Sequence, residues 1–436
     1  MTKSNLYVVS RPARSPEVKN TLSGIVDALS HHPAWAGVLA TSELDQRVVF
    51  LSEPPFGTGA LVGEAVRDRD IDPSRLWFED VTGTALAKRH VIDAVRVVGD
   101  RHAFHPVRQY LEGLSWDGVA RIARWLEYYC AVVPESEAQA RLIRSVGRKW
   151  LISCVARAMK PGCKVDTMLI LEGRQGIGKS TALSVLAGEG LHCDSAIDFG
   201  TKDACQILQG VWIFELAELD ALLRRDTSTI KAFLSRSYDR FRVPYGRAPE
   251  NVPRSVVFCG TVNHGDYLRD TTGNRRFWVV RCEDTLDTSG LSAARDALWA
   301  EAVHGFLRGE AWHLDPEHEA GMRDEHDARL EHDPWEERLE AWTNARTTET
   351  GELPYSMSEL LELGLGVPAQ SQNPRVTARV SRVLARLGYR KRKRSSLPRT
   401  YFYARRPEVA GLPACRPPSS EEISSVTTSP LQGDCP

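Results

Sequence analysis

Apolar residues follow two different spacings along the chain, and each spacing predicts a different kind of element. The first spacing, with apolar residues every three or four positions, is typical of amphipathic helices. It covers residues 18–32, 119–130 and 140–159. The second is a short continuous apolar run, which is found at 166–173, 211–216 and 254–263. These runs alternate with helical patterns at 179–188 and 227–236, so we expect an α/β domain with a mainly parallel sheet.

Shifts in this pattern divide the chain into four expected parts. We predict an accessory α+β region at 1–112, followed by an α/β domain with a helical lead-in and flanking helices at 113–345. A small basic module is expected at 346–406, and a disordered tail at 407–436. The tail is rich in Pro, Ser and Thr but poor in large apolar residues, and segments of this composition do not form a packed core.

Composition excludes some classes of protein. The chain of 436 residues has a formal net charge of -1, so a surface for nucleic acid requires local clustering of basic residues. No apolar run approaches the ~18 residues of a membrane span, so no membrane partner is expected. The nine cysteines form no C-x-x-C pair, which indicates reduced thiols in a cytoplasmic protein rather than a disulfide framework.

The segment "GRQGIGKST", residues 173–181, fits the phosphate-binding pattern G-x-x-x-x-G-K-[ST] between a predicted strand and a predicted helix. Glycines let backbone N–H groups wrap phosphates, and the start of the helix favours negative charge. Lys179 can reach the β- and γ-phosphates of ATP, and Ser180 can bind Mg²⁺. The predicted nucleotide-binding residues are Gly173, Gln175, Gly176, Ile177, Gly178, Lys179, Ser180 and Thr181.

Two further strands end in polar residues that suit ATP hydrolysis. In "GVWIFELAELD" the buried run ends at Glu215, which we assign to Mg²⁺ or its water, while Glu218 would activate the attacking water. The reverse assignment is open, because this type of strand more commonly ends in aspartate, and Glu218 could also be an ordinary helix-start residue. "RSVVFCGTVN" ends in Asn263, which would orient the water as a sensor residue; the alternative is a turn asparagine.

Residues 230–254 combine basic and aromatic side chains, with a predicted hairpin tip at "VPYGRAPEN". Cations neutralise phosphates and aromatic rings stack on bases, so the segment suits single-stranded nucleic acid. The alternative is a structural insert whose arginines are simply solvated. The candidate DNA contacts are Lys231, Arg240, Arg242, Tyr245 and Arg247.

Residues 373–406 are strongly basic and contain no Asp or Glu. An arginine stripe lies beside an apolar stripe on one predicted helix, and two basic strands follow Gly388. This is the outline of a winged helix, whose basic side chains would contact DNA; the alternative is a solvated basic surface. The candidate contacts are Arg375, Arg379, Arg382, Arg386, Lys391 and Lys393.

Six segments occur in an order that resembles a known family. They are "FHPVRQYLEGLSWDGVARI", "VGRKWLISCVARAMKPGCKVDTMLILEGRQGIGKST", "ELAELD", "IKAFLSRSYDRFRVPYGR", "VFCGTVN" and "DTTGNRRFWVV". Over roughly residues 100–345 the chain resembles the virulence-associated protein E family of phage and mobile-element proteins. That family is similar to superfamily 3 helicases, which belong to the AAA+ class.

The resemblance implies an AAA+-like ATPase that forms a homo-oligomeric ring on DNA. It places a DNA-gripping hairpin in the basic insert, and it implies that Arg275 or Arg276 reaches the nucleotide of a neighbouring subunit. The family is often linked to a primase, whereas roughly the first 100 residues show no recognisable primase acid cluster. A separate primase is therefore a candidate partner.

The leading hypothesis is an ATP-dependent DNA helicase or translocase that acts in phage or mobile-element replication. The first alternative is a replication initiator that binds DNA as an ATP switch without processive unwinding. The second alternative is a non-enzymatic interaction protein with a relic phosphate-binding loop. Strand displacement separates the first two hypotheses, and ATP hydrolysis separates both from the third.

Overall fold

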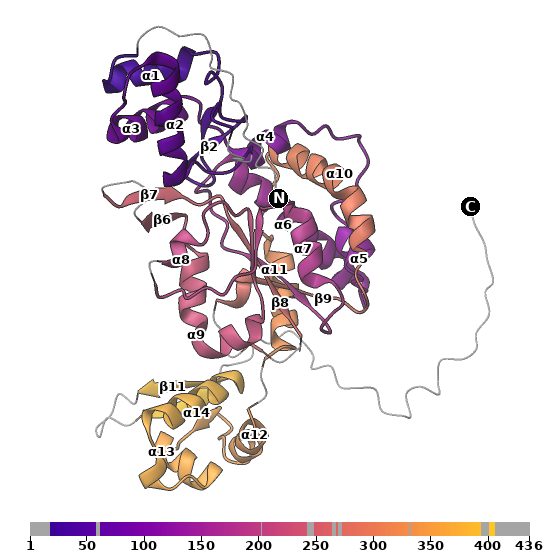
Figure 1. Ribbon diagram of the computed structural model, residues 1–436. Helices are drawn as coiled ribbons and strands as arrows, with labels where there is room; N and C mark the ends of the chain where they lie inside the picture. The colour runs from indigo at the N-terminus through magenta and orange to yellow at the C-terminus, as the bar shows by residue number, and fades with distance from the viewer. Residues whose placement is uncertain are drawn as a thin grey trace, which may run out of the picture. The chain divides into compact units, whose positions relative to one another are not determined.

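The computed structural model describes residues 18–57, 62–201, 203–241, 248–263, 267–268, 273–330, 333–393 and 401–405 (Figure 1). The chain divides into two compact units, residues 1–331 and 332–436. Among the described residues, no helix combines the length and the apolar character that crossing a bilayer would require.

The N-terminal region of the first unit has its own apolar core. Its elements are α1 (Leu22–His31), β1 (Leu39–Ser42), β2 (Arg47–Phe50), α2 (Asp68–Thr82) and α3 (Lys88–Arg101). Trp35 and Phe78 stack at the centre, with ring centroids 5.7 Å apart. The next helix, α4 (Pro106–Glu112), instead buries Val107 and Leu111 in the core of the following domain. That domain thus begins before residue 113, the predicted boundary.

A five-stranded, fully parallel sheet forms the centre of the first unit, as the apolar runs predicted. Its spatial order is β4 (His192–Cys193), β5 (Ile213–Leu216), β8 (Val257–Val262), β3 (Met168–Glu172) and β9 (Phe277–Arg281). Every residue of β3, β5 and β8 is buried, because helices cover both faces of the sheet. We call the edge where the strands end the carboxyl edge, and the opposite one the amino edge.

The helices divide between the two faces according to the alternation of side chains along β3. Leu169 and Leu171 face a cluster with α5 (Trp125–Tyr129), α6 (Glu137–Met159), α7 (Lys179–Ala187) and α10 (Thr288–Leu307). Met168 and Ile170 face a cluster with α8 (Asp203–Gln206) and α9 (Leu219–Leu234). At the edge strand β9, His326 of α11 (Pro316–Asp327) donates a 2.6 Å hydrogen bond to the Phe277 carbonyl.

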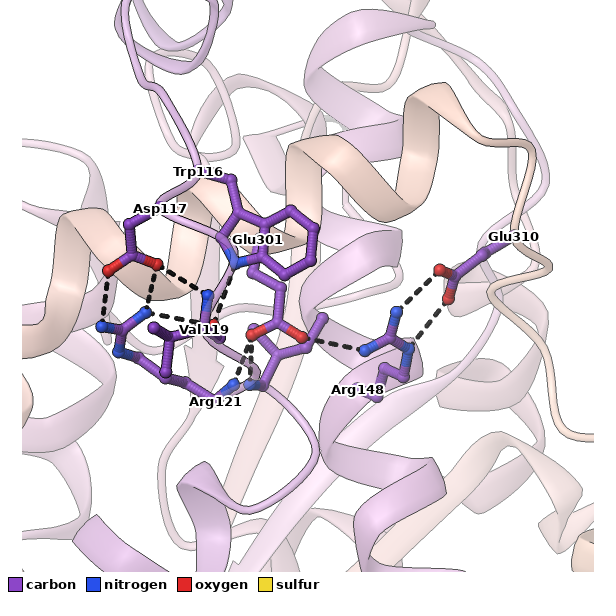
Figure 2. Close-up of polar contacts among 8 residues, drawn as sticks. Trp116, Asp117, Val119, Arg121, Arg148, Glu301 and Glu310 are labelled. Carbon is purple, nitrogen blue, oxygen red and sulfur yellow. Dashed lines mark hydrogen bonds and ion pairs between the residues drawn. The ribbon is translucent and has the colours of Figure 1, made fainter.

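A buried carboxylate fastens the segment "SWDGVARI" to the helical face. Figure 2 shows Glu301 of α10 lying between the Arg121 backbone and the Arg148 guanidinium of α6. Glu301 is 2% exposed and accepts hydrogen bonds from the Arg121 and Ile122 amides at 2.5 and 2.9 Å, and from Arg148 at 3.0 Å. Arg148 also bonds Glu310 at 2.7 and 2.8 Å. The segment is therefore a structural fastening between the lead-in and the two helices.

The second unit is a helical layer on a small antiparallel sheet. Its helical elements are α12 (Glu336–Asn344), α13 (Met357–Glu359), a π-helical turn over Leu360–Gly364, a 3₁₀ turn over Ala369–Ser371 and α14 (Pro374–Arg386). The sheet order is β10 (Glu352–Leu353), β12 (Tyr401–Arg405) and β11 (Tyr389–Lys393). Leu339 and Trp342 of α12 pack with Leu353 and Leu360, so this unit begins before residue 346, the predicted boundary. The predicted tail at 407–436 lies outside the described residues.

Replacing Glu301 with alanine tests the fastening. The change leaves two backbone amides and the Arg148 guanidinium without their acceptor, so we expect the first unit to lose about 3 kcal/mol of stability. Asp117→Ala is the matched control, because it breaks the solvent-exposed ion pair with Arg121 and should cost far less. Thermal unfolding of the two variants checks this; equal melting temperatures would contradict the role given to Glu301.

Candidate active site

The glycine-rich loop joins the carboxyl end of β3 to the start of α7. At Gly173 a Cβ atom would lie 2.7 Å from the Cys282 carbonyl oxygen, so only glycine fits there. Gly178 caps α7 with a φ of 96°, which disfavours any other residue. Ile177 is buried in the core, and its carbonyl accepts a 2.8 Å bond from the Leu286 amide. The loop is thus fixed at both ends and in the middle.

Lys179 lies at the centre of this loop and is 7% exposed. Its ammonium donates to the carbonyl oxygens of Gly173 and Arg174 at 2.6 and 2.7 Å, and to Asn263 Oδ1 at 3.3 Å. Burial lowers the pKa of Lys179, and the neighbouring Cys282 and Glu215 groups oppose that effect. The lysine therefore connects the loop to the end of β8, where Asn263 is exposed.

Glu215 is fully buried at the end of β5 and joins three elements. Its Oε1 accepts hydrogen bonds from Ser180 Oγ of α7 and Thr261 Oγ1 of β8, both at 2.7 Å, while its Oε2 lies 3.1 Å from His192 Nε2 of β4. Burial acts to raise the pKa of Glu215, but the hydrogen bonds from His192, Ser180 and Thr261 together bring it below its ordinary value. The carboxylate stays ionised at neutral pH.

His192 is a site residue that the sequence reasoning missed. It belongs to a strand of two residues, which is too short to produce a recognisable apolar pattern. Its partner Glu215 is distant in the sequence, so no local signal could have paired them.

Glu218 lies just beyond the buried strand, at the start of α9. It is exposed, and its backbone has φ 50° and ψ 43°, the left-handed region that non-glycine residues rarely adopt. Such strain persists where the surrounding structure imposes it, and it is concentrated at functional sites. Gln175, Gly176 and Thr181 are also exposed at this edge.

Ser180 and Glu215 at the carboxyl edge could bind Mg²⁺ only together with further ligands, such as phosphate oxygens and water. Among the described residues, no group of three or more His, Cys, Asp or Glu side chains could hold a metal ion. Ser180 and Glu215 offer a hydroxyl and a carboxylate oxygen, the hard ligands that Mg²⁺ prefers together with phosphate and water. His192 would orient the carboxylate from behind.

Arg275 and Arg276 lie at the opposite edge of the sheet from the loop. Strands β3 and β9 are parallel, and Phe277 at the start of β9 pairs with Met168 at the start of β3. The two arginines precede Phe277, whereas the loop follows the other end of β3, so the length of the strand, about 16 Å, separates them. Arg275 is exposed and makes no hydrogen bond or ion pair with any residue that the structure describes. Arg276 is held by the turn: its guanidinium bonds Ser235 Oγ at 2.9 Å and the Gly273 carbonyl at 3.3 Å.

The basic insert folds into the hairpin of β6 (Tyr238–Phe241) and β7 (Glu250–Pro253). Tyr238, Arg240 and the paired residues Pro253 and Asn251 are exposed on one face. The predicted contacts Arg242, Tyr245 and Arg247 lie outside the described residues.

Lys231, a predicted DNA contact, is buried. It is 7% exposed, and its ammonium lies 5.7 Å from the centre of the Phe277 ring. The helix that carries Lys231 turns this position toward the sheet, a direction that the charge pattern of the insert did not reveal.

Two arginines of the predicted C-terminal DNA surface are engaged within the second unit. Arg379 bonds both carboxylate oxygens of Asp333 at 2.8 Å, and Arg386 pairs with Glu336 at 2.7 Å. These ion pairs fasten α14 to Glu336 of α12 and to Asp333, which precedes that helix. Both guanidinium groups thus already have a carboxylate partner within the unit. Lys391 is exposed on β11. The side chains of Arg375, Arg382 and Lys393 lie outside the described set.

Comparison with known proteins identifies one family. The model of the virulence-associated protein E-like domain matches residues 111–331. An apo structure of the NrS-1 C-terminal region (305–718) is 10% identical with a TM-score of 0.46, covering 84% of this chain and 95% of that one. An A-form apo structure of the same region is also 10% identical with a TM-score of 0.46, covering 89% and 100%. No curated protein matches the chain significantly.

The ionised state of Glu215 gives a pH-dependent contribution to stability. Because its pKa lies below the ordinary value of 4.5, the contribution is fully present above that pH and is lost as the pH falls through the lower folded-state pKa. We expect the stability advantage of wild type over Glu215→Gln to be constant above pH 4.5 and to shrink below it. Melting temperatures of both proteins across the acid range check this. An advantage that already shrinks above pH 4.5 would mean that burial outweighs the hydrogen bonds.

Proposed function

Because the chain belongs to the virulence-associated protein E-like family, we propose that it is an ATP-driven DNA helicase or translocase in phage or mobile-element replication. The observation that carries the proposal is the joint hydrogen bonding of Glu215 to Ser180 and Thr261. One carboxylate connects the loop helix, the acid strand and the strand between β5 and β3. A nucleotide site of the additional-strand type needs these three elements at one edge.

Each side chain at the carboxyl edge has its own role in the proposed hydrolysis of ATP. The loop amides and Lys179 bind the phosphates of ATP, and the ammonium exchanges its carbonyl partners for phosphate oxygens. Ser180 and Glu215 would hold Mg²⁺, and the ion would supply positive charge to offset the negative charge on the phosphates. Glu218 activates the attacking water, because it is exposed while Glu215 is enclosed, and Asn263 orients that water from the end of β8.

We propose that this domain, whose sheet order is β9-β3-β8-β5-β4, assembles into an AAA+-like ring of the superfamily 3 type. In such a ring a neighbour completes each site. Arg275 suits the trans-acting role, since it is exposed and lies too far from the loop of its own chain. Its guanidinium would stabilise the charge that develops on the transferred phosphate.

The hairpin face formed by Tyr238, Arg240, Asn251 and Pro253 is the proposed grip on single-stranded DNA. It offers a cation for the backbone and an aromatic ring for a base. We further propose that the helix α14 and the β11–β12 pair act as a winged-helix-like module that touches DNA through its strands, including Lys391.

Lys179→Ala tests the enzymatic proposal. We expect it to lower ATP turnover with Mg²⁺ by on the order of 10²–10³-fold, because the phosphates lose their central cation. Lys88→Ala is the matched control, since Lys88 is an exposed lysine that pairs with Asp72 in the N-terminal region and should leave turnover unchanged. Turnover is measured with and without single-stranded DNA.

The outcome of that assay separates the remaining hypotheses. If wild type hydrolyses no ATP, or if Lys179→Ala has the activity of wild type, the enzymatic proposal fails. If wild type hydrolyses ATP but does not displace a strand from a forked duplex, an initiator without processive unwinding replaces the helicase.

Arg275→Ala tests the contribution in trans. We expect it to lose on the order of 10³-fold in turnover, because the charge on the transferred phosphate is no longer stabilised. Mixing it with Lys179→Ala, itself inactive, should restore some hydrolysis at sites that combine an intact loop with an intact Arg275. No recovery in the mixture, or normal turnover of Arg275→Ala alone, would contradict the role.

A further inference from the structure

Helix α9 spans the sheet from one edge to the other. Its sixteen residues, Leu219–Leu234, extend about 24 Å, with Glu218 at its start and Ser235 at its end. Leu219, Leu223 and Ile230 are buried against the sheet, so the helix is packed along its length. As one continuous helix, α9 would carry a displacement of its first turn, at the carboxyl edge, to its last turn, at the amino edge.

The last turn of α9 is fastened to the turn that carries the arginines. Ser235 Oγ accepts the 2.9 Å bond from Arg276 Nε and donates at 2.8 Å to the Lys231 carbonyl of its own helix. The Arg276 guanidinium is also 3.8 Å from Asp166, which precedes β3. Arg276 is thus a link between α9, the start of the central strand and the turn that presents Arg275.

The same end of α9 is fastened to the base of the hairpin. Arg254, 3% exposed, follows β7 and bonds both carboxylate oxygens of Asp239 in β6 at 2.6 and 2.8 Å. It also donates at 2.6 Å to the carbonyl of Phe233, in the last turn of α9. The hairpin stem is therefore clamped to the helix end through a buried ion pair.

A second buried arginine fastens this assembly to the ATPase core. Arg157 of α6 is 1% exposed and donates to the Val165 and Arg254 carbonyls at 2.7 and 3.2 Å. Val165 leads into β3, and Arg254 leads into β8. The stem of the hairpin, the end of α9 and the starts of two central strands thus form one connected assembly.

We propose that Arg276 is a positioning residue that couples the arginine turn to the DNA hairpin through Ser235 of α9. This inference rests on the proposed function and gives the two arginines different roles. Arg275 contacts the nucleotide of the neighbouring subunit, and Arg276 links the position of the arginine turn to that of the hairpin in its own subunit. The hairpin then responds to two nucleotides, one through Glu218 at the far end of α9 and one through the arginine turn.

The test compares Arg276→Gln, Ser235→Ala and the double variant, each in the full chain. Thr227→Ala is the matched control for the serine, because Thr227 makes the same kind of bond to a carbonyl of α9, at 2.6 Å to Leu223, away from the turn. ATP hydrolysis is measured with and without oligo(dT), and the ratio of the two rates reports coupling. A merely structural role would lower the melting temperature without changing this ratio.

We expect the stimulation ratio to fall toward one in Arg276→Gln and in Ser235→Ala, and to fall no further in the double variant, because both changes break the same link. Thr227→Ala should keep the wild-type ratio. If Arg276→Gln does not fold, Ser235→Ala, which removes only a hydroxyl group, carries the test.

Three results would overturn the proposal. The first is a wild-type stimulation ratio in both single variants. The second is a loss of basal hydrolysis in Arg276→Gln that mixing with Lys179→Ala restores, because Arg276 would then itself act in trans. The third is the absence of ATP hydrolysis in wild type, which removes the proposed function and this inference with it.

Discussion

The buried carboxylate of Glu215 is the constraint on which the candidate site depends. It draws Ser180, Thr261 and His192 from three different elements to one point at the carboxyl edge of the sheet. An ionised group with no exposed surface is stable only when hydrogen bonds replace its hydration, and here three side chains do so. The same bonds fix α7, and with it the loop and Lys179, relative to β5 and β8.

The two edges of the sheet hold different groups of functional candidates. The carboxyl edge holds the loop, Glu215, Glu218 and Asn263, while the amino edge holds the arginine turn and the hairpin stem. The proposed function requires the two edges to be connected. One packed helix and the hydrogen bonds at its last turn connect them.

Much of this arrangement could be predicted from the sequence, because it rests on local patterns. The glycine spacing around Lys179 and the apolar runs that end at Glu215 and Asn263 indicated a loop and two strands, and these elements lie at one edge of the sheet. The helix and hairpin of the basic module were also predicted correctly.

What the sequence did not reveal concerns partners that are distant along the chain. Nothing near Arg379 in the sequence reveals that Asp333 reaches it. Nothing near Lys231, predicted as a DNA contact, reveals that it is buried beside the ring of Phe277, which comes much later in the chain. His192 was missed for the same reason. A charge pattern shows which side chains are basic, whereas only the fold shows which of them are already paired.

The central claim is that a neighbouring subunit completes the nucleotide site. A cryo-electron microscopy structure with a non-hydrolysable ATP analogue, Mg²⁺ and single-stranded DNA tests it most directly. The account predicts a ring in which the phosphates lie in the loop at 173–178, with Arg275 of the neighbour at the γ-phosphate and the strand along Tyr238 and Arg240. A monomer with nucleotide bound, or a ring in which Arg275 lies away from every nucleotide, would contradict it.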